Sequence, residues 1–183
     1  MEQSAQKKEV TVSTEKANVV ALLFLIPVII LGIGYLLIWA PHLSTEAFKN
    51  LFLEWGFWFL PILLGGIVVH ELIHGVTWAL FTSRGFRSIR FGVIRKTLTP
   101  YCHSKEALKA RQYRLGALMP AIVLGFVPIL IAYGTGSVGL MGFGMIFTLA
   151  AGGDFLIVWL LRKTPRQALV EDHPSKPGCY VYE

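Results

Sequence analysis

Charged residues are scarce in this chain of 183 residues: Asp, Glu, Lys and Arg make up only 15% of it, against 54% hydrophobic residues. The mean hydropathy is +0.58, and the apolar residues run in long uninterrupted stretches. This pattern excludes an ordinary soluble domain and is typical of a membrane protein. The first apolar stretch is followed by no small-residue cleavage site, so we expect it to be a membrane anchor rather than a signal peptide.

Cysteine is nearly absent as well, and the two that occur, Cys102 and Cys179, fall in segments that we expect in the cytoplasm. A disulfide is therefore not expected. The formal net charge of +6 would suit a nucleic-acid partner in a soluble protein. In a membrane protein basic residues mark the cytoplasmic segments instead, so we expect a lipid bilayer as the partner and no nucleic acid.

Four apolar stretches are long enough to cross a bilayer. The expected fold class is an all-α membrane protein with four transmembrane helices and a short cytoplasmic β-hairpin and helix between the second and third. The expected divisions are a tail at 1–16, a membrane domain at 17–161 with spans at about 17–40, 51–82, 115–133 and 138–161, a cytoplasmic insertion at 83–114, and a tail at 162–183.

The insertion is the one sizeable polar segment. The alternation of Ile89, Phe91 and Val93 with their neighbours predicts a strand, with Lys96–Tyr101 as its hairpin partner. Ser104 is the expected N-cap of a short helix over Lys105–Arg114.

Basic residues set the orientation. All but one of the 17 Lys and Arg lie in the two tails and the insertion, which four spans place on one side. The positive-inside rule predicts a multi-pass protein of the cell membrane with both termini in the cytoplasm.

Three titratable residues, His70, Glu71 and His74, lie inside the second span. Positions i and i+4 of a helix share one face, so the two imidazoles converge on one point. Glu71 is one step round, within reach of a water at that point. The His-Glu-x-x-His spacing predicts a zinc hydrolase, with His70 and His74 as metal ligands and Glu71 as the catalytic general base. Charged groups inside a span are costly, which argues against an accidental match.

Asp154 is the single charge in the fourth span. Both spans run inward, and His74 and Asp154 lie at similar distances from the next arginine, so their depths agree. We expect Asp154 to be the third Zn²⁺ ligand, which leaves a fourth position for water. A helix-packing carboxylate is the alternative. His103 is either a solvated loop histidine or a functional one. Asp172 and His173 are expected at the surface of the tail, and the alternative is that they cap the site.

Four segments carry a family resemblance: HELIHG in the second span, TPYCHSKEALK after it, AGGDF in the last span and DHPSKPGCYVYE near the end. Over residues 58–181 the chain resembles a bacterial domain-of-unknown-function family, the putative zincin peptidases. That family is similar to the site-2 intramembrane metalloproteases, which place the zinc motif in one transmembrane helix and an aspartate ligand in a later one. The resemblance implies the same roles for His70, Glu71, His74 and Asp154.

The leading hypothesis is thus a zinc-dependent intramembrane or membrane-proximal metalloprotease acting on a membrane protein or peptide. A non-catalytic membrane protein clamped by zinc is an alternative. A divalent-metal transporter is a weaker one, because the outer halves of the spans offer few polar ligands. The sequence leaves the oligomeric state open.

Overall fold

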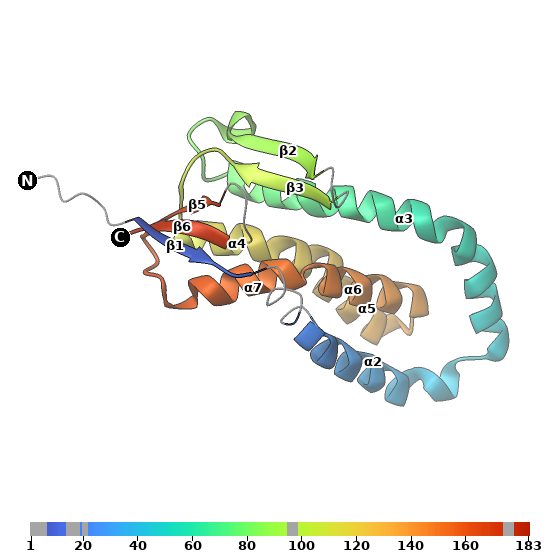
Figure 1. The fold of residues 1–183 in the computed structure, drawn as a ribbon. Helices are drawn as coiled ribbons and strands as arrows, with labels where there is room; N and C mark the ends of the chain where they lie inside the picture. The colour runs from blue at the N-terminus through green and yellow to red at the C-terminus, as the bar shows by residue number, and fades with distance from the viewer. Residues whose placement is uncertain (1–6, 14–18, 20–21, 95–98, 174–177) are drawn as a thin grey trace, which may run out of the picture.

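The computed structural model of the chain describes residues 7–13, 19, 22–94, 99–173 and 178–183. Helices extend to one side of the molecule and strands gather at the other, where the C-terminus lies (Figure 1). The helices are α2 (Leu25–Trp39), α3 (Thr45–Ala79), α4 (Ala110–Pro120), α5 (Val127–Thr135), α6 (Val138–Ala150) and α7 (Gly152–Leu160), with a π-helical segment, Ala121–Phe126, joining α4 to α5 and short 3-10 turns at Ala40–His42, Gly85–Ser88 and Leu161–Lys163.

Among the described residues, three helical stretches are long and apolar enough to cross a membrane: Leu25–His42, Gly56–Ala79 and Ala110–Thr135. α6 and α7 pass this test only as a pair, and they are bent by 44°. α3 is 35 residues long and contains Pro61, whose ring removes one helical hydrogen bond and favours a bend. The ribbon of α3 curves toward α2 at the N-terminal end of α3 (Figure 1).

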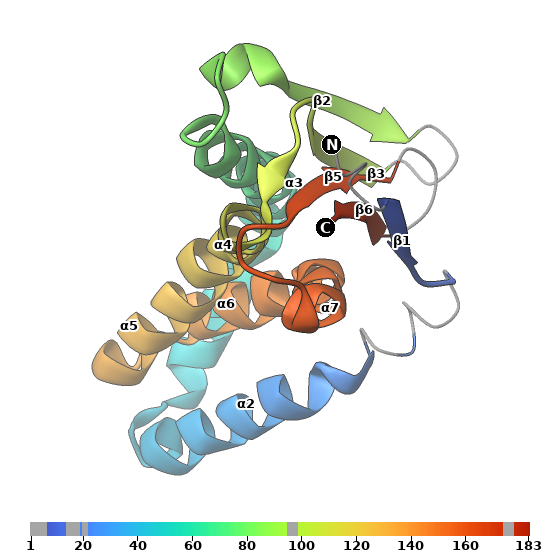
Figure 2. The ribbon, with the colours of Figure 1, turned by 90° about the vertical axis from the view of Figure 1, so that its left-hand side faces the viewer.

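In the described part of the chain, six strands form two antiparallel sheets. A hairpin of β2 (Ile89–Ile94) and β3 (Thr99–Ser104) lies over α3 (Figure 1). The larger sheet has the order β1-β6-β5-β4 and stands beside the ends of α4 and α7 (Figure 2). Its strands are β1 (Lys7–Thr11), β4 (Leu108–Lys109), β5 (Leu169–Asp172) and β6 (Gly178–Tyr182), and Lys7 pairs with Tyr182 at one corner.

The prediction of an all-α protein with four transmembrane helices is wrong. The fold is mixed α/β, because both polar tails contribute strands, and three helices rather than four are candidate spans. The apparent fourth span is interrupted at Ala151, where α6 ends and α7 begins. Strands as short as β1 and β5 carry little local periodicity, and the partner that stabilises β1 lies at the far end of the chain.

The insertion is also corrected in detail. β2 occupies the predicted strand, but β3 begins at Thr99 rather than Lys96, and residues 95–98 lie outside the described part of the chain. The predicted helix over Lys105–Arg114 begins only at Ala110, since Leu108 and Lys109 pair with β5. Ser104 ends β3 instead of capping the helix.

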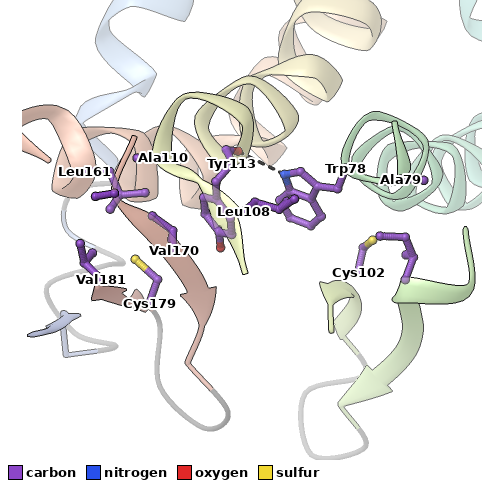
Figure 3. Packing of buried hydrophobic residues seen from close by; sticks show 12 residues of the cluster. Trp78, Ala79, Cys102, Leu108, Ala110, Tyr113, Leu161, Val170, Cys179 and Val181 are labelled. Atoms are coloured by element: carbon purple, nitrogen blue, oxygen red, sulfur yellow. Dashed lines mark hydrogen bonds between the residues drawn. The ribbon is translucent and has the colours of Figure 1, made fainter. Parts of the chain in front are cut away.

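A hydrophobic cluster joins the larger sheet to the helices. Figure 3 shows Leu108, Val170 and Cys179 from the sheet close to Tyr113 of α4, with Trp78 of α3 hydrogen-bonded to the Tyr113 carbonyl. A second cluster around Tyr35 and Ile129 packs α2 against α5 and α6. The first cluster fixes the sheet beside the helix that carries the His-Glu-x-x-His motif.

Candidate metal centre

Two histidines of α3 face one carboxylate of α7. His70 and His74 are one helical turn apart, with ring centroids 4.9 Å from each other. The Asp154 Oδ2 lies 3.2 Å from the His70 Nε2, and its Oδ1 lies 3.2 Å from the His74 Nε2. All three candidate donor atoms fall within 4.8 Å of one another. The structure thus brings together the three side chains that the sequence named as ligands.

The bend between α6 and α7 positions the carboxylate. Asp154 lies in the first turn of α7, three residues after the break at Ala151. α6 contacts α2, α3 and α5, whereas α7 contacts α4 and lies near the sheet (Figure 2). The break at Ala151 thus separates the segment packed on the other apolar helices from the segment that carries Asp154.

The geometry fits a zinc ion. Donors held at about 2.0–2.1 Å from one tetrahedral zinc lie about 3.3 Å apart, close to the two nitrogen–oxygen distances of 3.2 Å observed here. Two imidazole nitrogens and one carboxylate form the donor set of catalytic zinc sites. Among the described residues no fourth His, Cys, Asp or Glu joins this group.

A backbone carbonyl determines which ring nitrogen of His74 carries the proton. Its Nδ1 lies 2.9 Å from the Gly116 carbonyl oxygen, and because a carbonyl only accepts, Nδ1 carries the proton. Nε2 of the neutral ring then has its lone pair available, as metal binding requires. The Nδ1 of His70 is buried and has no hydrogen-bond partner among the described residues, so only Asp154 orients that ring.

An aromatic stack supports His74 from one side. The His74 ring lies 5.2 Å from the ring of Trp78, and Trp78 lies 5.2 Å from that of Tyr113. Gly116 makes this close packing possible, because a Cβ at that position would lie 2.0 Å from the Trp78 Nε1. α3 and α4 are thereby locked together next to the site.

Glu71 opens onto a pocket of about 320 Å³ that we call the site pocket. The Glu71 carboxylate is within hydrogen-bonding reach of the Cys102 backbone N–H on β3. The site pocket is lined by His70, Glu71, His74 and Trp78 of α3, residues 100–103 of β3, Tyr113 of α4, Ala150 at the end of α6, Gly153, Asp154 and Ile157 of α7, and Asp172, His173 and Gly178 near the C-terminal hairpin.

Asp172 is the centre of a second set of polar side chains in the same pocket. Asp172 accepts hydrogen bonds from the Tyr113 hydroxyl and from the Ser104 backbone N–H, at 3.2 Å for the latter, and its Oδ2 lies 3.5 Å from the His103 Nδ1. Burial raises the pKa of the Asp172 carboxyl, and nearby His103 opposes that shift. The expectation that Asp172 and His173 lie at the surface is wrong, since both line the pocket and His173 is buried.

This second set was missed because its members come from three distant segments. Residues 169–172 are a polar-looking tail in the sequence, and only their pairing with β4 and β6 turns Asp172 inward. The alternation of Leu169 and Glu171 with Val170 and Asp172 was the available signal for a strand.

Cys102 also lines the pocket but differs from a metal ligand in its chemistry. Burial raises the pKa of the Cys102 thiol, and the negative charges of Glu71 and Asp172 raise it further. A thiol that stays protonated is a poor zinc ligand, because zinc binds the thiolate.

A family model described as "putative zincin peptidase" (DUF3267) matches residues 63–169, more than half of the chain. The match contains the His-Glu-x-x-His motif and Asp154. Searches of curated proteins and of solved structures gave no match. The chain belongs to the putative zincin peptidase family.

Proposed function

We propose that the protein is a zinc-dependent metallopeptidase that cleaves a membrane protein or peptide within or next to the bilayer. The observation that carries this proposal is the convergence of His70, His74 and Asp154 beside Glu71, at the wall of an open pocket. The family assignment supports a metallopeptidase independently of this geometry.

His70 and His74, through Nε2, and Asp154, through its carboxylate, would hold the zinc. When bound there, zinc lowers the pKa of a water molecule and polarises a peptide carbonyl. Glu71 lies on the pocket side of α3 and would accept the proton of that water, then deliver it to the leaving amine. The Cys102 backbone N–H lies within reach of the Glu71 carboxylate on this side of the helix.

The pocket favours catalysis over a structural zinc clamp. Structural zinc sites are closed by four protein ligands, whereas catalytic sites keep a position open. The described residues supply three clustered donors and a pocket large enough for water and part of a peptide. A clamp would require neither the pocket nor Glu71.

We place α2, α3 and the helical stretch Ala110–Thr135 in the bilayer, with the bent pair of α6 and α7 returning the chain across it. Their outer faces carry apolar side chains that no protein atoms cover: Leu37, Phe57 and Leu130 are each at least 70% exposed. Such faces are stable only in lipid or against a partner. β1 and β6 belong to one sheet, so both termini lie on one side of the membrane, and we propose the cytoplasmic side from the basic residues.

The test combines metal analysis with cleavage of a fluorogenic transmembrane peptide by purified protein in nanodiscs. Wild type and Glu71→Gln should each hold about one zinc per chain, and Glu71→Gln should lose most of the hydrolysis, by a factor of about 10²–10⁴. His74→Ala should lose both zinc and activity. Cleavage that is unchanged in Glu71→Gln would overturn the mechanism.

The clamp alternative has its own readout. Cobalt substituted for zinc should give an absorption spectrum that changes when acetohydroxamate is added, because an open site accepts a new ligand. A spectrum that acetohydroxamate leaves unchanged, together with absent hydrolysis, would favour the clamp.

A further inference from the structure

His103 and Asp172 form a pair on the wall of the site pocket that β3 and β5 provide. Both side chains line the same pocket as Glu71 and the three candidate ligands. The His103 side chain is 35% exposed, while that of Asp172 is only 11% exposed. The histidine therefore reaches the open part of the pocket, and the carboxylate stands behind it.

Asp172 is held independently of His103. The Tyr113 hydroxyl donates to Oδ1 and the Ser104 backbone N–H donates to Oδ2, so two elements, α4 and β3, fix the carboxylate. A buried carboxylate with two such donors keeps one orientation. It can therefore set the orientation of a neighbouring side chain.

The His103 Nδ1 faces this carboxylate at 3.5 Å, a separation at the long end of hydrogen bonding that commonly tightens when substrate binds. A carboxylate at Nδ1 orients an imidazole. No described residue forms a hydrogen bond to the other ring nitrogen, Nε2, which is left for a molecule in the pocket. Nε2 can donate to that molecule when the ring is the imidazolium, in which both nitrogens carry protons.

The position of β3 brings this N–H to the substrate. The Cys102 N–H reaches Glu71, which places the residue before His103 beside the proposed general base. Tyr101 and His103 alternate with Cys102 along the strand, and their rings meet edge to face. All three residues border the site pocket, and Cys102 also packs into the hydrophobic cluster.

We propose that His103 is a catalytic residue that acts as an imidazolium: its Nε2–H donates a hydrogen bond to the carbonyl oxygen of the scissile peptide, and its Nδ1–H faces Asp172, which is its positioning residue. This inference rests on the proposed peptidase function. The hydrogen bond strengthens as the oxygen gains negative charge during attack, so it lowers the barrier rather than tightening substrate binding. No proton or electron is transferred by the pair.

Kinetics test the catalytic role. His103→Gln should lower kcat about 100-fold, the usual effect of removing one such donor, with little change in KM and with zinc content unchanged. Asp172→Asn should lower kcat in wild type but add little in the His103→Gln background, because it acts through His103. His42→Gln, which removes an exposed histidine outside the site pocket, serves as the matched control and should stay within about threefold of wild type.

Two readouts do not depend on turnover. In ¹⁵N-histidine spectra, both ring nitrogens of His103 should carry a proton, and Asp172→Asn should change the Nδ1 signal. Addition of N-phosphoryl-leucyl-tryptophan, whose tetrahedral anionic group resembles the attacked carbonyl, should shift the His103 Nε2 signal, and His103→Gln should weaken binding of this probe about 100-fold.

The outcomes separate this inference from the function on which it rests. An active wild type with an equally active His103→Gln variant overturns the role of His103 and leaves the peptidase intact. A wild type that neither cleaves nor binds the phosphoryl dipeptide overturns both. A ¹⁵N spectrum in which Asp172→Asn leaves His103 unchanged overturns the pair whatever the activity.

Discussion

The two ring nitrogens of His74 have different partners, and the surrounding residues hold the ring in that orientation. Nδ1 is bound to the Gly116 carbonyl, the ring is stacked on Trp78, and Nε2 faces Asp154. Partners of this kind around a metal ligand commonly contribute 10- to 100-fold in metal affinity. The support of His74 can therefore be tested without altering any ligand.

Gly116→Ala should weaken zinc binding by about 10- to 100-fold. The added Cβ would lie 2.0 Å from the Trp78 Nε1, so α4 must move and take the Gly116 carbonyl away from His74. Competition with a zinc chelator measures the affinity. Gly142→Ala is the control, because a Cβ at Gly142 meets nothing within 4 Å, and equal losses in the two variants would refute this explanation.

The two cysteines should resist alkylation in the folded protein. Burial raises the pKa of Cys179 to about 12 and that of Cys102 well above its usual value. Both are buried and free, so the reactive thiolate is scarce and poorly accessible. Iodoacetamide near pH 8 followed by mass spectrometry should find both unmodified, and both modified after denaturation. Rapid labelling of native Cys102 would contradict its place in the core.

At the scale of elements, one carboxylate ties the hairpin to the end of α3. Glu106 accepts hydrogen bonds from the Ser83 backbone N–H, at 2.8 Å, and from the Ser88 hydroxyl. These bonds lower the pKa of the Glu106 carboxyl to about 2. The hairpin that forms one wall of the site pocket is thereby fixed at its base.

Glu106→Gln should destabilise the protein near pH 7 but make less difference at about pH 3. A carboxyl whose pKa is lower in the folded state stabilises that state above its ordinary pKa of 4.5, and this contribution fades as the pH falls toward about 2. Melting temperatures of wild type and variant at both pH values measure the effect. A difference that grows on acidification would show that the carboxylate has another role.

The helices were more predictable from sequence than the strands. His70 and His74 are four residues apart on an apolar stretch, so their shared face follows from helix geometry alone, and charge counting gave Asp154 a matching depth. β1, β4 and β5 are each two to five residues long, and they exist because of partners far along the chain. Asp172 belongs to the pocket only through that pairing, which no local pattern encodes.

At the scale of the whole molecule, the larger sheet joins the two ends of the chain. Lys7 is opposite Tyr182, and Thr11 is opposite Gly178. Whatever number of times the helices cross a bilayer, the residues on both sides of this pairing share one compartment. The sheet thus constrains topology in a way that hydropathy cannot.

A reporter fused to either end of the chain should read out the same side, which we expect to be the cytoplasm. In bacteria, green fluorescent protein should fluoresce at both ends, whereas alkaline phosphatase should be inactive at both, because it needs an oxidising compartment. Fusion of both reporters to the segment at Ala40–His42 is the control and should give the opposite result. Opposite readouts at the two ends would show that β1 and β6 do not pair in the membrane-inserted protein.

The larger sheet can form only after all the helices have been synthesised. β5 and β6 follow α7 in the sequence, so they leave the ribosome after every helix has been made. Helices with local hydrogen bonds can form at once, but pairing between residues as far apart as Lys7 and Tyr182 must wait. Asp172, and the wall of the site pocket that it supports, are therefore the last parts of the site to reach their places. The helices that carry His70, His74 and Asp154 are thus complete before the larger sheet can form, so the candidate site stays incomplete until translation has passed the helices.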